Sequence, residues 1–166
     1  MSLKLLGTVN VTSTVTSLTI NVPSGSGDLV IWYSLRGNTS TRCMIRFNGS
    51  TSEPFKIYAF QQNESMLVDH QYWQNTIGIY GFSTNYSSNN YSTGTIEVAR
   101  YADTSWYKNI SGEQSWTTES PTGYSGVDMI GGTWQSYNAI NSVNFVATGT
   151  DSLYPGSYVS VYARGS

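Results

Sequence analysis

His70 is the one histidine in the chain of 166 residues and therefore its one imidazole. A serine or cysteine nucleophile needs such a base, together with a carboxylate that orients the ring. Asp69 directly precedes His70, and adjacent side chains of an extended chain point to opposite faces. No G-x-S-x-G sequence occurs. The sequence therefore predicts a surface or hydrogen-bonded histidine and no catalytic triad.

The segment from Ser105 to Lys108 matches the S-x-x-K motif, but the K-T-G sequence that accompanies this motif is missing. Residues three apart in a strand face opposite sides, so we interpret the match as accidental. One histidine, one cysteine and dispersed carboxylates give no metal-ligand spacing. Gly25 and Gly27 precede a predicted strand, whereas a phosphate-binding loop precedes a helix. We expect no metal, no cofactor and no enzyme activity. A glycosidase needs two carboxylates across a cleft, and the sequence neither excludes nor favours such a pair.

Aromatic residues make up 14% of the chain and include five tryptophans. Their side chains can form a platform for sugars, form a protein interface, or pack in a core. The candidate ligand contacts are Tyr72, Trp73, Trp134 and Tyr137. The single cysteine, Cys43, is predicted to be a small buried side chain in a strand.

Alternation of apolar and polar residues predicts the elements that must position these groups. Segments 18–22, 43–47 and 159–163 carry apolar side chains at every second position, which is typical of strands buried on one face. The segment 83–94 is polar and predicted to be an exposed loop, and 112–139 is predicted to be an excursion or loop lid. Many short strands in one domain, residues 1–166, favour a β-sandwich or a barrel. The expected strands are 3–11, 15–22, 29–36, 42–48, 55–61, 76–82, 95–101, 106–111, 114–118, 140–147 and 157–164.

Net charge and hydrophobic patterning bear on two possible partners, a nucleic acid and a membrane. Charged residues make up 11% of the chain and the net charge is −2, so no basic patch for nucleic acid is visible. No apolar run approaches the roughly 18 residues that a membrane-spanning helix needs. We expect neither a nucleic acid nor a membrane as partner.

Three segments carry a family likeness. Residues 29–52 contain a strand, an arginine, a turn and a second strand that ends in Arg-Phe-Asn-Gly. Residues 94–110 contain a strand followed by Tyr-Ala-x-Thr and a lysine, and residues 134–166 run from a tryptophan through Ala-Ile and Gly-Ser to a final Val-Tyr strand. In this order the segments resemble a jelly-roll module of tailed-bacteriophage virion proteins. The chain departs from that module at Tyr162-Ala163-Arg164, where the usual pattern is Tyr-Gly-apolar.

The resemblance implies an antiparallel, jelly-roll-like β-sandwich and a structural role in the virion. Such modules are head decoration (cement) proteins, often trimeric, or the receptor-binding heads of tail fibres. The module fills the chain and leaves no room for a fibre shaft, which favours decoration. The expected partners are then the major capsid protein and further copies of this chain in a homotrimer. The alternative is a tail-tip or tail-fibre protein that recognises a host surface glycan or protein.

The apolar start of the chain is the candidate contact in the decoration hypothesis. Leu3, Leu5 and Leu6 are predicted to form an arm or edge strand that docks on the capsid or on a neighbouring copy. The alternative is an ordinary first strand of the sandwich.

Overall fold

The computed structural model describes residues 2–37, 41–63, 66–74, 77–82, 91–117, 125–149 and 152–165. The described residues form strands, turns and loops, and none of their segments is a helix that could cross a membrane. The strands are β1 (Leu3–Asn10), β2 (Ser17–Asn21), β3 (Asp28–Leu35), β4 (Thr41–Phe47), β5 (Phe55–Asn63), β6 (Met66–Gln74), β7 (Ile77–Phe82), β8 (Ser92–Val98), β9 (Lys108–Thr117), β10 (Ser125–Trp134), β11 (Ser142–Ala147) and β12 (Tyr158–Arg164).

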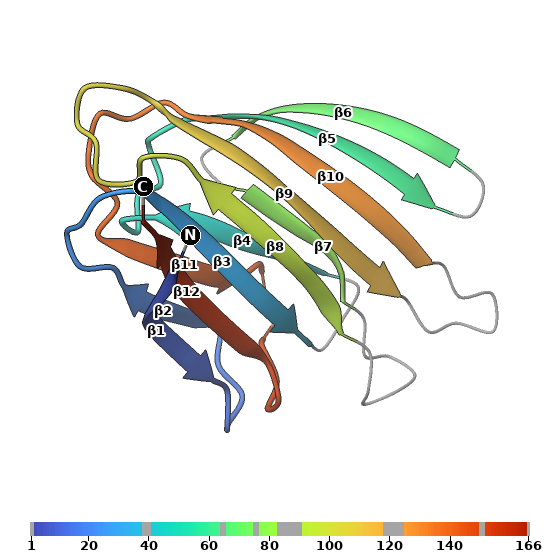
Figure 1. Ribbon diagram of the computed structural model, residues 1–166. Helices are drawn as coiled ribbons and strands as arrows, with labels where there is room; N and C mark the ends of the chain where they lie inside the picture. Colours follow the sequence, from blue (N-terminus) through green and yellow to red (C-terminus); the bar gives the residue numbers. More distant parts are fainter. Residues whose placement is uncertain are drawn as a thin grey trace.

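The strands build two layers (Figure 1). The larger layer has the order β1-β12-β3-β8-β9-β10-β5-β6, and all its pairings are antiparallel. The smaller layer has the order β7-β4-β11-β2 and is also antiparallel. Among the described residues, one parallel pair, Phe82 with Thr117, joins a strand of one layer to a strand of the other.

Eight of the strands form a jelly roll. We call these the framework strands and number them one to eight in chain order: β1, β2, β3, β4, β7, β8, β11 and β12. Their order is 1-8-3-6 in the larger layer and 2-7-4-5 in the smaller layer. Successive framework strands therefore pass from one layer to the other, except β4 and β7, which pair within the smaller layer; this is the arrangement of a jelly roll of two Greek keys. The remaining two pairs, β5 with β6 and β9 with β10, extend the larger layer beyond the smaller one (Figure 1).

The core lies between the two layers because alternate residues of their strands face each other. Ile31 and Tyr33 of β3 are buried against Val143 and Phe145 of β11 in one cluster. The ring centroids of Tyr33 and Phe145 lie 5.9 Å apart across the layers. Burial of each large apolar side chain contributes about 1.5–3 kcal/mol to folding. This packing confirms the prediction of an all-β, jelly-roll-like sandwich.

The observed strands differ from the expectations in three places. Segment 112–139 is not a loop lid, because its described residues complete β9 and form β10, which pairs with β9 and β5 over its length. Strand β6 was not expected either, although it pairs with β5 from Phe55 to Asn63. Residues 92–94, expected in the exposed loop 83–94, belong to β8, and residues 83–90 lie outside the described residues.

Candidate functional site

Ser105 and Lys108, the two ends of the S-x-x-K match, lie in different environments. Ser105 is exposed in the loop before β9, whereas Lys108 is buried at the start of that strand. The Lys108 ammonium donates to the carbonyl oxygen of Ser136 at 3.0 Å, and burial lowers its pKa against the opposing effect of Asp103 and Glu53. Lys108 thus anchors the loop that follows β10. His70 falls on β6, and its side chain lies outside the described residues.

Cys43 is fully buried on β4, which confirms the prediction of a small buried side chain. Burial raises the pKa of its thiol, so the thiol is protonated at neutral pH. A protonated thiol is a poor nucleophile and a poor metal ligand. Among the described residues no group of three or more histidine, cysteine or carboxylate side chains could hold a metal ion.

The aromatic candidates do not form one platform. Trp134 is fully buried, and its ring packs against Phe47 and Phe55 at centroid distances of 5.4 and 6.3 Å. The structure therefore removes Trp134 from the candidate ligand contacts. Tyr137 is exposed and lies 4.9 Å from Tyr107, ring centroid to ring centroid. The side chains of the other two candidates, Tyr72 and Trp73, lie outside the described residues.

The three leucines of the first strand divide between two faces. β1 is an edge strand of the larger layer and pairs with β12 from Leu3 to Asn10. Leu6 lies at a bulge between Leu5 and Gly7, on the opposite face from Leu5, and packs partly buried against the core. Leu3 and Leu5 are 45% and 53% exposed on the outer face, and Leu5 stands beside Tyr162 in the register.

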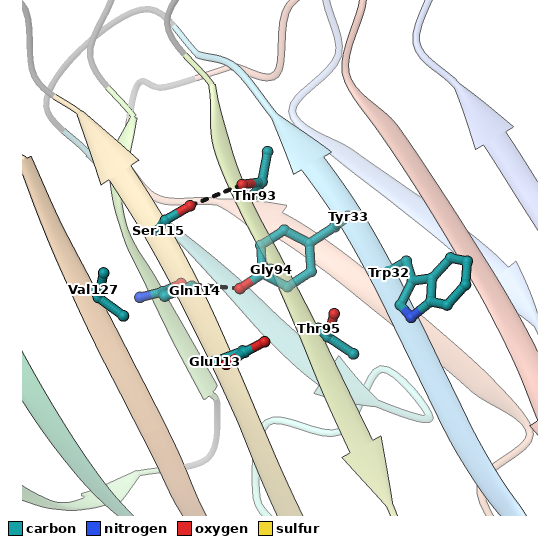
Figure 2. A pocket seen from close by; sticks show the side chains of 9 residues that line it. All are labelled: Trp32, Tyr33, Thr93, Gly94, Thr95, Glu113, Gln114, Ser115 and Val127. Atoms are coloured by element: carbon teal, nitrogen blue, oxygen red, sulfur yellow. Dashed lines mark hydrogen bonds between the residues drawn. The ribbon is translucent and has the colours of Figure 1, made fainter.

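A hollow of about 440 Å³ lies on the outer face of the larger layer. Trp32 of β3 stands on one side of it and Val127 of β10 on the other, with polar side chains of β8 and β9 between them (Figure 2). The hollow forms beside the large Trp32 indole, where the neighbouring strands carry the smaller side chains of Thr93, Thr95 and Ser115. We refer to it as the outer hollow; its outer-face residues are Trp32, Thr93, Thr95, Glu113, Ser115 and Val127.

The register explains why these distant residues meet. Trp32 pairs with Thr95, Thr95 with Glu113, and Thr93 with Ser115. Paired residues of antiparallel strands point to the same face. The Thr93 and Ser115 hydroxyls also share a hydrogen bond of 3.0 Å (Figure 2).

A buried polar network supports the floor of the hollow. The Tyr33 hydroxyl donates to Gln114 Oε1 at 3.0 Å, Gln114 Nε2 donates to Asp128 Oδ2, and Trp116 Nε1 donates to Asp128 Oδ1 at 3.3 Å. Burial, together with the neighbouring Cys43 and Asp128, raises the pKa of Tyr33, so its hydroxyl keeps the proton that it donates. Hydrogen-bonded buried groups of this kind fix one arrangement of the strands.

The outer hollow is not predicted from the sequence. Segment 29–36 is almost continuously apolar, so its pattern gives no signal that Trp32 faces outwards. Its position between the core residues Ile31 and Tyr33 is the available signal, because side chains alternate along a strand. That signal identifies the face of Trp32 but not the neighbours that the register brings to it.

The chain is therefore a jelly-roll β-sandwich with a hollow on the outer face of its larger layer. Comparisons with protein-family models, with curated proteins and with solved structures gave no match.

Proposed function

We propose that the protein is a structural protein of a tailed-bacteriophage virion, a decoration protein that binds the outer surface of the capsid and stabilises the head. The resemblance of segments 29–52, 94–110 and 134–166 supports the class of protein. The fold supports it as well, because it is the fold that the resemblance implies.

The observation that carries the proposal is the exposed apolar edge of β1. Leu3 and Leu5 present large apolar side chains at the rim of the larger layer. Natural edge strands usually carry charges or bulges that prevent pairing with another strand. β1 has both, in Lys4 and in the bulge after Leu5, so a partner is expected to contact the leucine side chains and not to add a strand.

The chemistry of the chain suits such a contact. With 11% charged residues, the surface offers few long-range charge interactions. Apolar and hydrogen-bonded contacts depend little on salt. A capsid presents many equivalent sites, so each contact can be modest while the shell gains from their number. We therefore expect capsid binding that persists when the ionic strength is raised.

Replacing both exposed leucines, in a Leu3→Ser/Leu5→Ser variant, is expected to weaken capsid binding about tenfold to a hundredfold, because two partly exposed apolar side chains lose their burial in the interface. The measurement is co-sedimentation of the purified protein with capsids that lack it. Substitution is a sharper test than deletion of residues 1–6, because β1 pairs with β12 along its length.

A Val127→Ser/Met129→Ser variant is the matched control, since it removes two similarly exposed apolar side chains from β10. It should bind capsids like the wild type. Equal binding by both double variants would contradict the proposed contact. A trimer in light scattering that the leucine variant converts to a monomer would instead assign the leucines to contacts between copies of the chain.

A receptor-binding protein of the tail is the second candidate, and one observation favours it. The rings of Tyr107 and Tyr137 contact each other at a tilt of 38° while both side chains remain exposed, next to the exposed Trp106. Such groups form rigid contacts for sugars or proteins. Quantitative mass spectrometry of purified virions separates the candidates: a simple ratio to the major capsid protein is expected for decoration, and a handful of copies would overturn it in favour of the tail.

A further inference from the structure

We infer that the outer hollow is a binding site for a neutral glycan. The inference does not depend on the proposed capsid contact, because two strands, β12 and β3, separate β1 from the strands that form the floor of the hollow.

The wall of the hollow supplies an aromatic surface. The Trp32 side chain is 42% exposed, although the Tyr162 ring packs against it with centroids 4.8 Å apart. Tyr162 thus holds the indole in place and leaves part of it open. An ordered, partly exposed indole can contact the apolar C–H face of a sugar ring at little cost in conformational entropy.

The floor supplies hydrogen-bonding groups in a row. Thr93, Thr95 and Ser115 offer hydroxyls, which can both donate and accept, and Glu113 offers a carboxylate, which only accepts. In the described part of the chain the Glu113 carboxylate has no hydrogen-bond or ion-pair partner, so its oxygens are available to sugar hydroxyls. Hydrogen bonds to a charged acceptor are stronger than those between neutral groups.

Charge selects a neutral ligand over an acidic one. Glu113 is the one charged residue among the described residues that line the hollow. Arg164, at the end of β12, does not line the hollow, and its guanidinium bonds Glu97 at 2.6 Å and Asp28 at 3.4 Å. A sialic acid or uronic acid would therefore place its carboxylate near Glu113 without a cation to compensate.

The size of the hollow fits a short oligosaccharide. Its volume of about 440 Å³ lies within the usual range of small-molecule sites, about 300–1,000 Å³. The hollow crosses from β3 to β10, three strand spacings or about 14 Å. This length accommodates more than one sugar ring.

The test is binding of the whole chain to an array of oligomers of glucose, galactose, mannose and N-acetylglucosamine, with sialylated and uronic-acid oligomers alongside. We expect binding to a neutral oligomer, whose dissociation constant is then measured by calorimetry. Trp32→Ala should raise that constant at least tenfold, and Glu113→Gln, which keeps the shape of the side chain, should raise it severalfold.

Two controls keep the test specific. Trp106→Ala removes a more exposed tryptophan, beside the Tyr107–Tyr137 pair and outside the hollow, and should leave binding unchanged; a loss of binding in this variant would assign the glycan to that pair and overturn the inference. The Leu3→Ser variant, which leaves Leu5 beside Tyr162 unchanged, should also bind the glycan normally, which separates this site from the capsid contact. Circular dichroism checks that each variant is folded. The inference is overturned if no neutral oligomer binds at millimolar concentration, if acidic oligomers bind better, or if the folded Trp32→Ala and Glu113→Gln variants bind like the wild type.

Discussion

Replacing Trp134 by alanine is expected to lower the free energy of unfolding by about 3–5 kcal/mol, the range found when large aromatic side chains are removed from cores. Trp134 is fully buried where β10 ends, and its ring lies between Phe47 of the smaller layer and the Lys108 ammonium, which is 5.4 Å from the ring centroid. The truncation leaves a cavity that these neighbours cannot fill. Urea denaturation followed by far-ultraviolet circular dichroism measures the loss.

Tyr137 provides the comparison, because it lies three residues further along the chain and is 57% exposed. Tyr137→Ala should change the free energy of unfolding by less than about 1 kcal/mol, since exposed substitutions usually have small effects. If Trp134→Ala were equally mild, the indole would not be part of the core. Trp134 would then return to the candidate ligand contacts together with Tyr137.

The sequence predicts most of the jelly-roll framework because its strands follow the alternation rule. In β2, β4 and β11 the buried positions coincide with the apolar residues, as at Ile20, Ile45 and Phe145. The single cysteine fits the same pattern on β4. A strand with one buried face and one solvated face has apolar residues at every second position. This period of two is enough to predict the strand from the sequence.

In the extension of the larger layer, β5 and most of β9 are predicted as strands, whereas β10 is not predicted because it inverts the same rule. In β10 the apolar Val127 and Met129 face outwards, whereas Asp128 between them is buried and accepts hydrogen bonds. Gly131 and Gly132 add residues that are uncommon inside strands. Alternation still exists in β10, but with the polar residue inside, so its apolar pattern does not indicate the buried face.

The outer hollow is not predicted for a different reason: its residues are brought together by the register of the strand pairs. Its residues come from β3, β8, β9 and β10, and no short segment of the sequence contains more than two of them. A shift of one residue in any of these pairings would turn one strand's contribution to the opposite face. Side-chain alternation along one strand cannot supply that information, because pairing depends on contacts between distant segments.

Replacing Gly94 by alanine is expected to lower the free energy of unfolding by at least about 3 kcal/mol, since it combines overpacking with the loss of a buried hydrogen bond. A Cβ at this position would lie 2.6 Å from the carbonyl oxygen of Glu113 and even closer to the Tyr33 hydroxyl. Backbone of β9 cannot move away without breaking its pairing with β8, and Tyr33 cannot move without releasing Gln114. Thermal and urea denaturation measure the effect.

Gly131→Ala is the control that separates crowding from the general effect of adding a methyl group to a strand glycine. Among the described residues, no atom lies within 4 Å of a Cβ built on Gly131, so this variant should be neutral or stabilised by up to about 1 kcal/mol through the lower entropy of its unfolded chain. Equal stability of the two variants would mean that β8 does not rest on Tyr33. The floor of the outer hollow would then lack the support that the Tyr33–Gln114–Asp128 network provides.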